Sequence, residues 1–251
     1  MIQYEYPLNE RIRTLLRLEG LFSRADFFIA QDHGLEHHAA LLVLFEICEV
    51  TSRADLKSDL LQELERQKQL LEPLRNNPGI SEEALDELLA SVDDITHRLR
   101  GMMGKAGQHL RDNEWLMSIK QRTGIPGGVC EFDLPSYHFW LNQPIELRRQ
   151  CLFSWLEPML AIRDGILIVM CMLRDSGKAI HYLAKNGVFQ QMLSGRVVQM
   201  LRVRLDADVP CFPEISANKY AINIRFTSLG GPQKSRNCEQ DIEFDMTLCS
   251  L

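Results

Sequence analysis

Residues 200–206 have the sequence MLRVRLD, and this stretch decides the fold of the C-terminal part of the chain. Apolar and charged residues alternate along it. Side chains of a β-strand point alternately to opposite faces, so a period of two predicts a strand with one buried face and one exposed face. The apolar members are Leu201, Val203 and Leu205, and the charged members are Arg202, Arg204 and Asp206.

Three further stretches indicate that this strand has partners. YAINIRF (220–226), QDIEFDMTL (240–248) and IQYEY (2–6) have the same period. Asn186-Gly187, between AIHYLAK and VFQQML, predicts a two-residue hairpin, because a type I′ turn needs positive φ at both positions. We therefore expect an antiparallel sheet with one face on the helices and one face exposed.

From about residue 8 to residue 174 the apolar period is instead that of a helix. Two leucine-rich segments flank NNPGIS (76–81), where Ser81 is a suitable N-cap and Glu82 and Glu83 follow it in the first turn. These segments predict an antiparallel helical hairpin. The apolar positions are Leu56, Leu60, Leu61, Leu64, Leu71 and Leu74 before the break, and Leu85, Leu88, Leu89, Val92, Ile95 and Leu99 after it.

These patterns together predict an α+β protein. An N-terminal strand at 1–7 is expected to pair with the C-terminal sheet, an α-helical domain to occupy 8–176, and a β-strand domain to occupy 177–251.

Composition limits the function classes. The net charge of -6 argues against a protein whose whole surface binds nucleic acid, since phosphate binding needs a sustained positive field. The longest apolar run, GILIVMCML (165–173), is well short of the ~20 residues that cross a bilayer. The N-terminus lacks the apolar core of a signal peptide. We expect a cytoplasmic protein without a membrane partner.

The cysteines indicate reduced thiols. There are 7 of them, an odd number, and they are widely spread and never arranged as C-x-x-C. This distribution fits neither a disulfide framework nor a zinc site.

GIPGGVCEFDLPSYHFWL (124–141) is the least ordinary stretch of the chain and allows three interpretations. In a thiol enzyme, Cys130 would be the nucleophile, His138 the base and Asp133 its orienting partner. In an anion nest, Gly127 and Gly128 would direct backbone N–H groups at a phosphate. No family nucleophile signature and no phosphate-loop motif accompanies these residues, so both interpretations are weak.

The third interpretation is a joint between helices, and the pattern favours it. Pro126 ends a helix at about 111–123, Gly127 and Gly128 permit a tight reversal, and Asp133 caps a new helix with Pro135 in its first turn. The expected apolar anchors of this joint are Val129, Phe132, Phe139, Trp140 and Leu141.

Three histidines, His33, His37 and His38, are close enough in sequence to suggest a metal site. The segment lacks H-E-x-x-H spacing and a third ligand, so a helical turn begun by Asp32 with surface histidines is favoured. We expect neither a metal nor a cofactor.

The best candidate for a binding surface is basic. Arg202, Arg204 and Arg225 are expected to share the polar face of the sheet, with Lys219 at the strand entrance. The order of the strands decides whether this positive charge survives, because the last strand carries acidic residues that pair with arginines if it is a direct neighbour. The acidic residues are Asp241, Glu243 and Asp245. A second basic stretch runs from Arg98 to Arg122.

Segments spread over nearly the whole chain resemble the ZapD family of bacterial cell-division factors. They are PLNERIRTLLRLE (7–19), LLQELERQ (60–67), IPGGVCEFDLP (125–135) followed by His138, Trp140 and Leu141, FPEIS (212–216) and IRF (224–226). The family segments keep their order in this chain.

The resemblance implies an α-helical domain followed by a β domain, a homodimer, no catalytic activity, and binding of the C-terminal tail of the tubulin-like protein FtsZ at a basic surface. Basic positions linked to FtsZ binding in the family correspond to Arg53 and Arg225. A further basic position corresponds to Ala221, where Lys219 is expected to substitute from the same strand face. In the family no chemistry is assigned to the 125–135 segment, which supports its interpretation as a joint between helices.

The implied mechanism is cross-linking. A dimer that presents two weak tail sites gains effective concentration on a filament displaying many tails, and so bundles FtsZ protofilaments at the mid-cell division site. A lower FtsZ GTPase activity would follow indirectly. The alternative is a nucleic-acid-binding regulator that uses the same basic sheet face, which the net negative charge disfavours.

Overall fold

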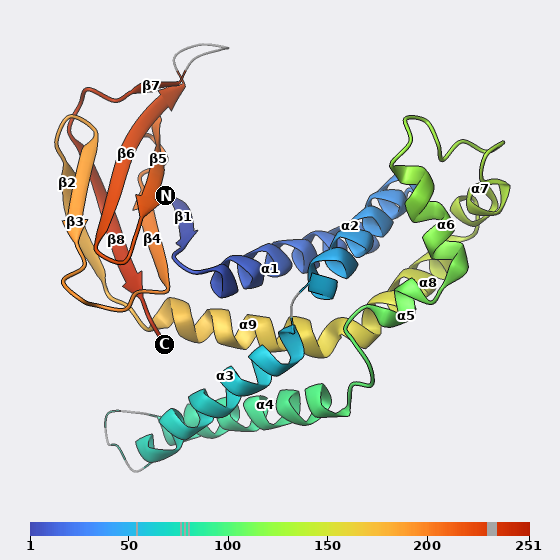
Figure 1. Cartoon of the computed structure of the whole chain (residues 1–251), viewed down its shortest axis with the longest axis horizontal. Coiled ribbons are helices and arrows are strands. Elements are labelled where there is room, and N and C mark those ends of the chain that lie inside the picture. The colour runs from blue at the N-terminus through green and yellow to red at the C-terminus, as the bar shows by residue number, and fades with distance from the viewer. Residues whose placement is uncertain (54, 76, 78, 80, 230–234) are drawn as a thin grey trace. The chain divides into compact units, whose positions relative to one another are not determined.

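The structure is a computed structural model, and it contains helices in the N-terminal part and antiparallel strands in the C-terminal part (Figure 1). The predicted α+β class is confirmed. Contacts divide the chain into two compact units, Met1–Leu16 with Met170–Leu251, and Arg17–Val169. We call these the β unit and the helical unit. The residues described are 1–53, 55–75, 77, 79, 81–229 and 235–251.

The division between the units falls inside two helices, α1 (Glu10–Ile29) and α9 (Leu160–Asp175). The domain limits expected from sequence, 8–176 and 177–251, lie close to the ends of these helices and remain a prediction. The other helical elements are α2 (Gly34–Arg53), α3 (Leu56–Leu71), η1 (Glu72–Leu74), α4 (Glu82–Gly101), α5 (Gln108–Arg111), α6 (Glu114–Thr123), α7 (Pro135–Leu141), α8 (Ile145–Leu156) and η2 (Glu157–Met159).

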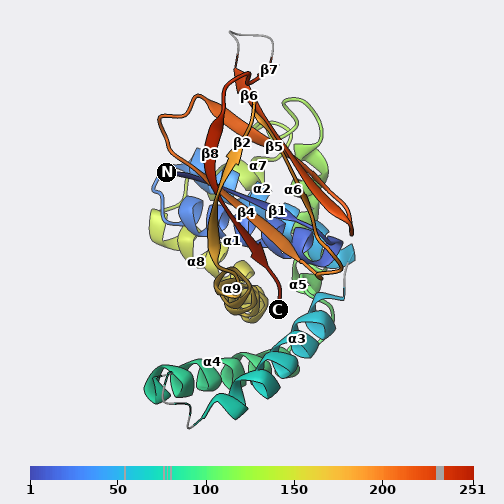
Figure 2. The same cartoon turned by 90° about the vertical axis from the view of Figure 1, so that its left-hand side faces the viewer.

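Helices α3 and α4 lie side by side and antiparallel (Figures 1 and 2), which confirms the predicted hairpin. Each buries an apolar stripe that includes Leu60 and Leu64 on α3 and Leu89 and Val92 on α4. Ser81 is the N-cap of α4, because its side chain accepts a hydrogen bond from the backbone N–H of Ala84 at 3.3 Å. Positions 76, 78 and 80 of the predicted break lie outside the described residues.

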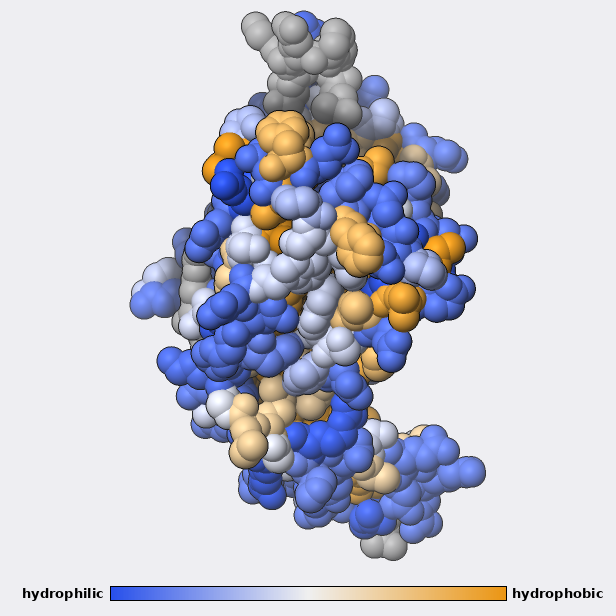
Figure 3. Space-filling model, turned by 90° about the vertical axis from the view of Figure 1, so that its right-hand side faces the viewer, coloured by the Kyte–Doolittle hydropathy of each residue, from blue (hydrophilic) through white to orange (hydrophobic). Residues whose placement is uncertain are grey.

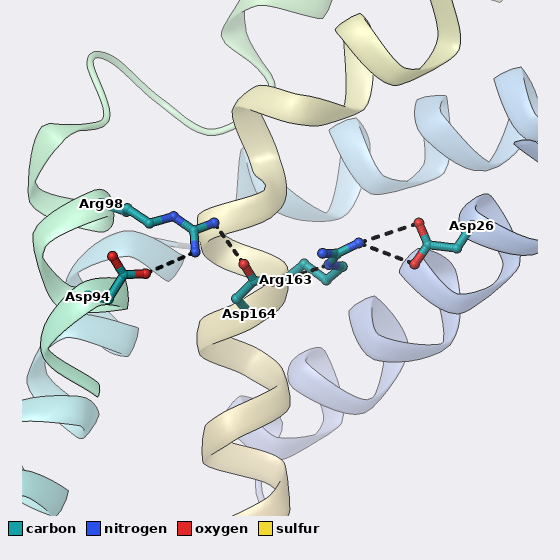
Figure 4. A network of polar contacts seen from close by, with 5 residues as sticks. All are labelled: Asp26, Asp94, Arg98, Arg163 and Asp164. Carbon is teal, nitrogen blue, oxygen red and sulfur yellow. Dashed lines mark hydrogen bonds and ion pairs between the residues drawn. The ribbon is translucent and has the colours of Figure 1, made fainter. Parts of the chain in front are cut away.

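A chain of ion pairs joins α1, α4 and α9 within the helical unit (Figure 4). Arg98 Nη2 lies 2.7 Å from Asp164 Oδ2 and Arg98 Nη1 3.4 Å from Asp94 Oδ2. The next residue of α9, Arg163, contacts Asp164 at 3.1 Å and Asp26 at 3.3 Å. The hydrogen bond to the Asp164 carboxylate raises the pKa of the Arg98 guanidinium. Two arginines and three aspartates thus link three helices.

The β unit contains two antiparallel sheets. The first sheet has the strand order β1-β4-β8-β2, and the second has the order β3-β6-β5, with β7 paired to β6. The strands are β1 (Ile2–Pro7), β2 (Ala179–Ala184), β3 (Val188–Met192), β4 (Met200–Leu205), β5 (Cys211–Ala217), β6 (Ala221–Leu229), β7 (Ser235–Asn237) and β8 (Ile242–Cys249). The expected N-terminal strand forms as β1 and pairs with β4 from Ile2↔Leu205 to Pro7↔Met200.

The two sheets cover each other's apolar faces, and here the expectation of one sheet with a face on the helices is wrong. Leu201 and Val203 of the first sheet belong to the same buried cluster as Ile222, Ile224 and Phe226 of the second. The alternating pattern showed correctly that each strand has one buried face. The pattern does not show what packs on that face, because alternation is a property of one strand and the element that covers it comes from elsewhere in the sequence.

The Asn186-Gly187 turn forms, but the strands beside it do not pair as a hairpin. Asn186 and Gly187 have φ of 51° and 70°, and the N–H of Val188 donates to the carbonyl of Lys185 at 3.0 Å. Beyond this bridge, β2 pairs with β8 and β3 pairs with β6. The predicted pairing is therefore wrong, because the turn carries the chain from one sheet to the other.

The expectation of reduced cysteines without a disulfide is also wrong at one pair. Cys211 and Cys238 are joined by a disulfide over a sequence separation of 27. They flank β6: Cys211 is opposite Ser228, and the N–H of Cys238 donates to the carbonyl of Phe226 at 2.9 Å. Strand pairing brings them together, which sequence spacing does not show. The free cysteines are Cys48, Cys130, Cys151, Cys171 and Cys249.

In the described part of the chain, no helix has both the length and the apolar character that crossing a membrane requires.

Candidate partner-binding surface

The 124–134 segment joins α6 to α7, as the pattern favoured. Gly127 has a φ of 71°, and a Cβ on Gly128 would lie 2.6 Å from the carbonyl oxygen of Arg122. Pro135 is the first residue of α7. The expected cap is wrong, because the N-cap residue is Leu134 and the Asp133 carboxylate instead pairs with Arg122 at 3.4 Å. Pro126 lies after α6, which ends at Thr123.

The apolar anchors of this joint differ in part from those expected. Trp140 is buried, whereas Phe132 and Phe139 are 81% and 68% exposed. Tyr137, which the pattern did not single out, is fully buried and its hydroxyl lies 2.6 Å from His38 Nδ1. Burial raises the pKa of Tyr137 and lowers that of His38, which favours the neutral form of both hydrogen-bonded groups. Trp115 and Trp155 complete an aromatic cluster with Tyr137 and Trp140.

The arrangement does not favour a thiol enzyme. Cys130 is exposed, and His138 Nε2 lies 3.7 Å from a Glu131 carboxylate oxygen. In the described residues, no hydrogen bond joins Cys130 to His138, and Asp133 is held by Arg122. A nucleophile needs its base within hydrogen-bonding reach, so these three residues do not form an activated set.

The histidines of α2 and the turn before it have separate partners. His33 Nδ1 accepts from the N–H of Leu35 at 3.2 Å, while His37 Nε2 lies 2.8 Å from the carbonyl oxygen of Gln31. His37 is 0% exposed, so the expectation of surface histidines is wrong for it. Burial, followed by the nearby Arg148, lowers the pKa of His37. No group of three metal-binding side chains occurs among the described residues.

The shared basic face expected for the sheet does not form. Arg202 and Arg204 lie on β4 in the first sheet, and Arg225 lies on β6 in the second sheet. Arg202 pairs with Glu5 of β1 at 3.2 Å, and Arg204 pairs with Asp245 of β8 at 3.2 Å. The acidic strand β8 is a direct neighbour of β4, so the neutralised alternative is the one found.

The other two acidic residues of this segment have partners in the same sheet unit. The Asp241 carboxylate accepts from the N–H of Asn186 at 2.9 Å, and Glu243 lies 3.8 Å from His181 Nε2. The outer face of the first sheet is therefore a network of mixed charge, which leaves little excess positive charge.

Arg225 occupies a different environment. It is exposed, and among the described residues it takes part in no ion pair. It borders an open groove of about 430 Å³ on the second sheet, lined also by Val188, Glu214, Ser216 and Asn223. Because Ile224 and Phe226 point into the core, alternation directs Arg225 and Asn223 to the outer face. This groove is the strongest candidate for a binding surface on the β unit.

Lys219 lies in the turn between β5 and β6 rather than on the strand face, because β6 begins only at Ala221. Its ammonium group lies 4.8 Å from the centre of the Tyr220 ring. It is exposed and free to contact an anion from the end of the strand. Ala221 is largely buried and pairs with Met192.

The second basic stretch is mostly neutralised within the helical unit. Arg100 pairs with Glu65 at 3.7 Å and Lys120 pairs with Glu49 at 3.1 Å, in addition to the pairs of Arg98 and Arg122. The charges within the stretch did not reveal Glu65 and Glu49 as partners, because these two residues lie on other helices, α3 and α2.

Arg53 is the last residue of α2, and its side chain lies outside the described part of the structure. A groove of about 330 Å³ lies beside the end of this helix and is lined by Thr51, Ser52, Lys57 and Lys105, among others. The Lys57 ammonium is already bound to the carbonyl of Met102 at 2.7 Å, whereas the side chain of Lys105 is exposed.

On the face drawn in Figure 3, apolar side chains occur in small groups separated by hydrophilic ones. Scattered exposed apolar residues are normal for a protein surface and do not by themselves indicate a partner. The grooves and their charged side chains are therefore more informative than surface hydropathy.

Comparison with known proteins identifies relatives over the whole length. The family model described as "ZapD: Cell division protein" matches residues 16–225. A protein of Dechloromonas aromatica named "Cell division protein ZapD" is 58% identical over 252 residues, with 100% of both chains covered. Proteins of the same name from Chromobacterium violaceum and Nitrosomonas europaea are 54% and 55% identical, covering 100% of this chain and 100% and 96% of their own.

Proposed function

Because the chain belongs to the ZapD family of cell division proteins, we propose that it binds the C-terminal tail of FtsZ and cross-links FtsZ protofilaments. The full-length similarity to proteins named for cell division carries the cell-division part of this proposal. The binding of FtsZ is supported by Arg225, which is exposed at an open groove and forms no ion pair with the residues that the structure describes.

Three basic residues are proposed to contact the FtsZ tail. Arg225 at the groove and Lys219 at the end of β6 are exposed and have no carboxylate partner among the described residues. Arg53 at the end of α2 is the third. Arg202 and Arg204 keep at most a supporting role, because Glu5 and Asp245 already neutralise them.

Cross-linking needs more than one tail site per particle, and a homodimer supplies two. A flexible tail tethered to a filament binds each site weakly, but the second contact is intramolecular and therefore has a high effective concentration. The dimer holds neighbouring protofilaments together, and slower exchange of FtsZ subunits lowers their GTPase activity indirectly. The chain acts in the cytoplasm at the division site without catalysis of its own.

Co-sedimentation with polymerised FtsZ tests the proposal. The Arg53→Glu/Arg225→Glu variant is expected to lose binding and bundling, because charge reversal turns attraction of an acidic tail into repulsion. Arg196→Glu is the matched control, since Arg196 is also an exposed arginine of the β unit. Circular dichroism and sedimentation velocity verify that fold and dimer persist in each variant.

Full binding by the double charge-reversal variant at moderate salt would contradict the electrostatic account. A monomeric wild-type protein that still bundles filaments would contradict cross-linking by a dimer. An oligonucleotide affinity equal to the affinity for the tail would instead favour the nucleic-acid alternative.

A further inference from the structure

The outer face of the second sheet arranges three chemically different side chains in one row. Val188 of β3 and Glu214 of β5 are each the register partner of Arg225 on β6. All three are exposed and line the groove of about 430 Å³. We call Val188, Arg225 and Glu214 the cross-strand row. Its order across the sheet is apolar, positive, negative.

The two charges of the row are adjacent but not joined. Residues directly opposite in an antiparallel pair have Cβ atoms about 4.5–5.5 Å apart, so an ion pair between Arg225 and Glu214 is within reach of their side chains. Nevertheless, in the described part of the molecule neither side chain forms an ion pair. Both charges are therefore available to a ligand.

The row is unsuited to a purely acidic peptide. A carboxylate bound to Arg225 would lie one strand away from the Glu214 carboxylate, and like charges at that distance repel each other. A ligand that also places a positive charge on Glu214 removes this repulsion and forms a second ion pair. Complementarity of charge thus requires both signs in the ligand, in a fixed order.

The dimensions of the row set the length of the ligand segment. Neighbouring strands are about 4.8 Å apart, so the row extends about 10 Å from Val188 to Glu214. An extended chain advances about 3.3 Å per residue and directs only alternate side chains to one face, so three side chains that face the row belong to a segment of about five residues. The next row, Gln190, Asn223 and Ser216, is uncharged and offers hydrogen-bonding groups to the ligand backbone.

The flanking strands are fixed in place around the row. The Cys211–Cys238 disulfide anchors β5, and the turn that precedes Val188 packs Gly187 against the backbone of Cys238. A site held in its binding geometry before the ligand arrives loses less entropy on binding. The row therefore has the rigidity that recognition of charge order needs.

We propose that the cross-strand row binds an FtsZ tail segment in which an apolar, an acidic and a basic side chain occupy alternate positions, on Val188, Arg225 and Glu214 respectively. This inference rests on the proposed function and adds a specificity to it. Glu214, which a purely basic site would not include, becomes a binding residue.

Calorimetric titration of the full-length protein with a synthetic FtsZ tail peptide tests the row. Glu214→Gln is expected to weaken binding by up to about fivefold, as for loss of one exposed ion pair. Arg225→Gln is expected to weaken it at least as much. The matched control is Glu243→Gln, the same change at an exposed strand residue of the first sheet, which should bind as the wild type does.

A second comparison requires no change to the fold. A tail peptide with its basic residues replaced by glutamine should bind the wild type more weakly, and should bind Glu214→Gln at least as tightly as the wild type, because that variant lacks the repelling carboxylate. If Glu214→Gln binds the unmodified tail as tightly as the wild type or more tightly, binding at the cross-strand row is contradicted, while tail binding itself is not. Absence of any binding by the wild type overturns the proposed function itself.

Discussion

Gly128 shows how closely the backbone of the joint approaches the end of α6. A Cβ at this position would lie 2.6 Å from the carbonyl oxygen of Arg122 and 2.8 Å from the Cβ of Ile125. Neither atom is the end of a flexible side chain that can move aside. Only glycine fits at position 128 without a shift of these atoms.

Gly128→Ala is expected to lower the free energy of unfolding by about 1–3 kcal/mol, as overpacking does. Urea unfolding monitored by circular dichroism measures this loss. Gly101→Ala, at the end of α4, is the control, because a Cβ there meets no atom within 4 Å and alanine favours the helix. Equal stability of Gly128→Ala and the wild type would show that the joint can shift to admit a methyl group.

Single residues were predictable from sequence only where the determining interactions are local. The turn residues Asn186 and Gly187 have the positive φ that their types favour. The outward direction of Arg225 follows from alternation. The neutralisation of Arg202 was not predictable, because its partner Glu5 belongs to β1, far away in sequence. The tail-binding residues themselves stay a prediction.

Among the elements, the strands show the same distinction: the sequence predicted what depends on one strand alone and did not predict what depends on its partners. The period of two located β4, β6 and β8 correctly, because burial of alternate side chains is a property of each strand alone. It did not show that β2 and β3 belong to opposite sheets, because pairing depends on the partners each strand meets. The disulfide was missed for the same reason.

Reduction of the Cys211–Cys238 disulfide is expected to destabilise the β unit by about 3–4 kcal/mol, the chain-entropy value for a loop of this length. Hydrogen exchange of the β5 and β6 amides, with and without dithiothreitol, measures the change. The Cys211→Ser/Cys238→Ser variant should be equally destabilised and insensitive to the reductant.

Cys130→Ser is the control for this experiment, because Cys130 is an exposed free thiol and its replacement should change neither protection nor the response to dithiothreitol. Identical exchange in the oxidised and reduced wild type would mean that strand pairing alone sets the stability of this sheet.

At the scale of the whole molecule, the two units differ in how the chain builds them. The helical unit uses consecutive residues, Arg17–Val169, whereas the β unit combines Met1–Leu16 with Met170–Leu251. The alternation in residues 2–6 predicted an N-terminal strand, and that strand, β1, pairs with β4. The limits of the domains could not be located, because α1 and α9 continue through them.

The pairing of β1 with β4 has a consequence for folding during synthesis on the ribosome. The first strand to emerge has no partner until Met200–Leu205 is translated, a delay of roughly 10–40 s at usual elongation rates. Arrested nascent chains that contain residues 1–190 should therefore be cut by protease within residues 2–7 but resist it within residues 17–169. Resistance at both places would mean that something other than β4 protects residues 2–7 from the protease.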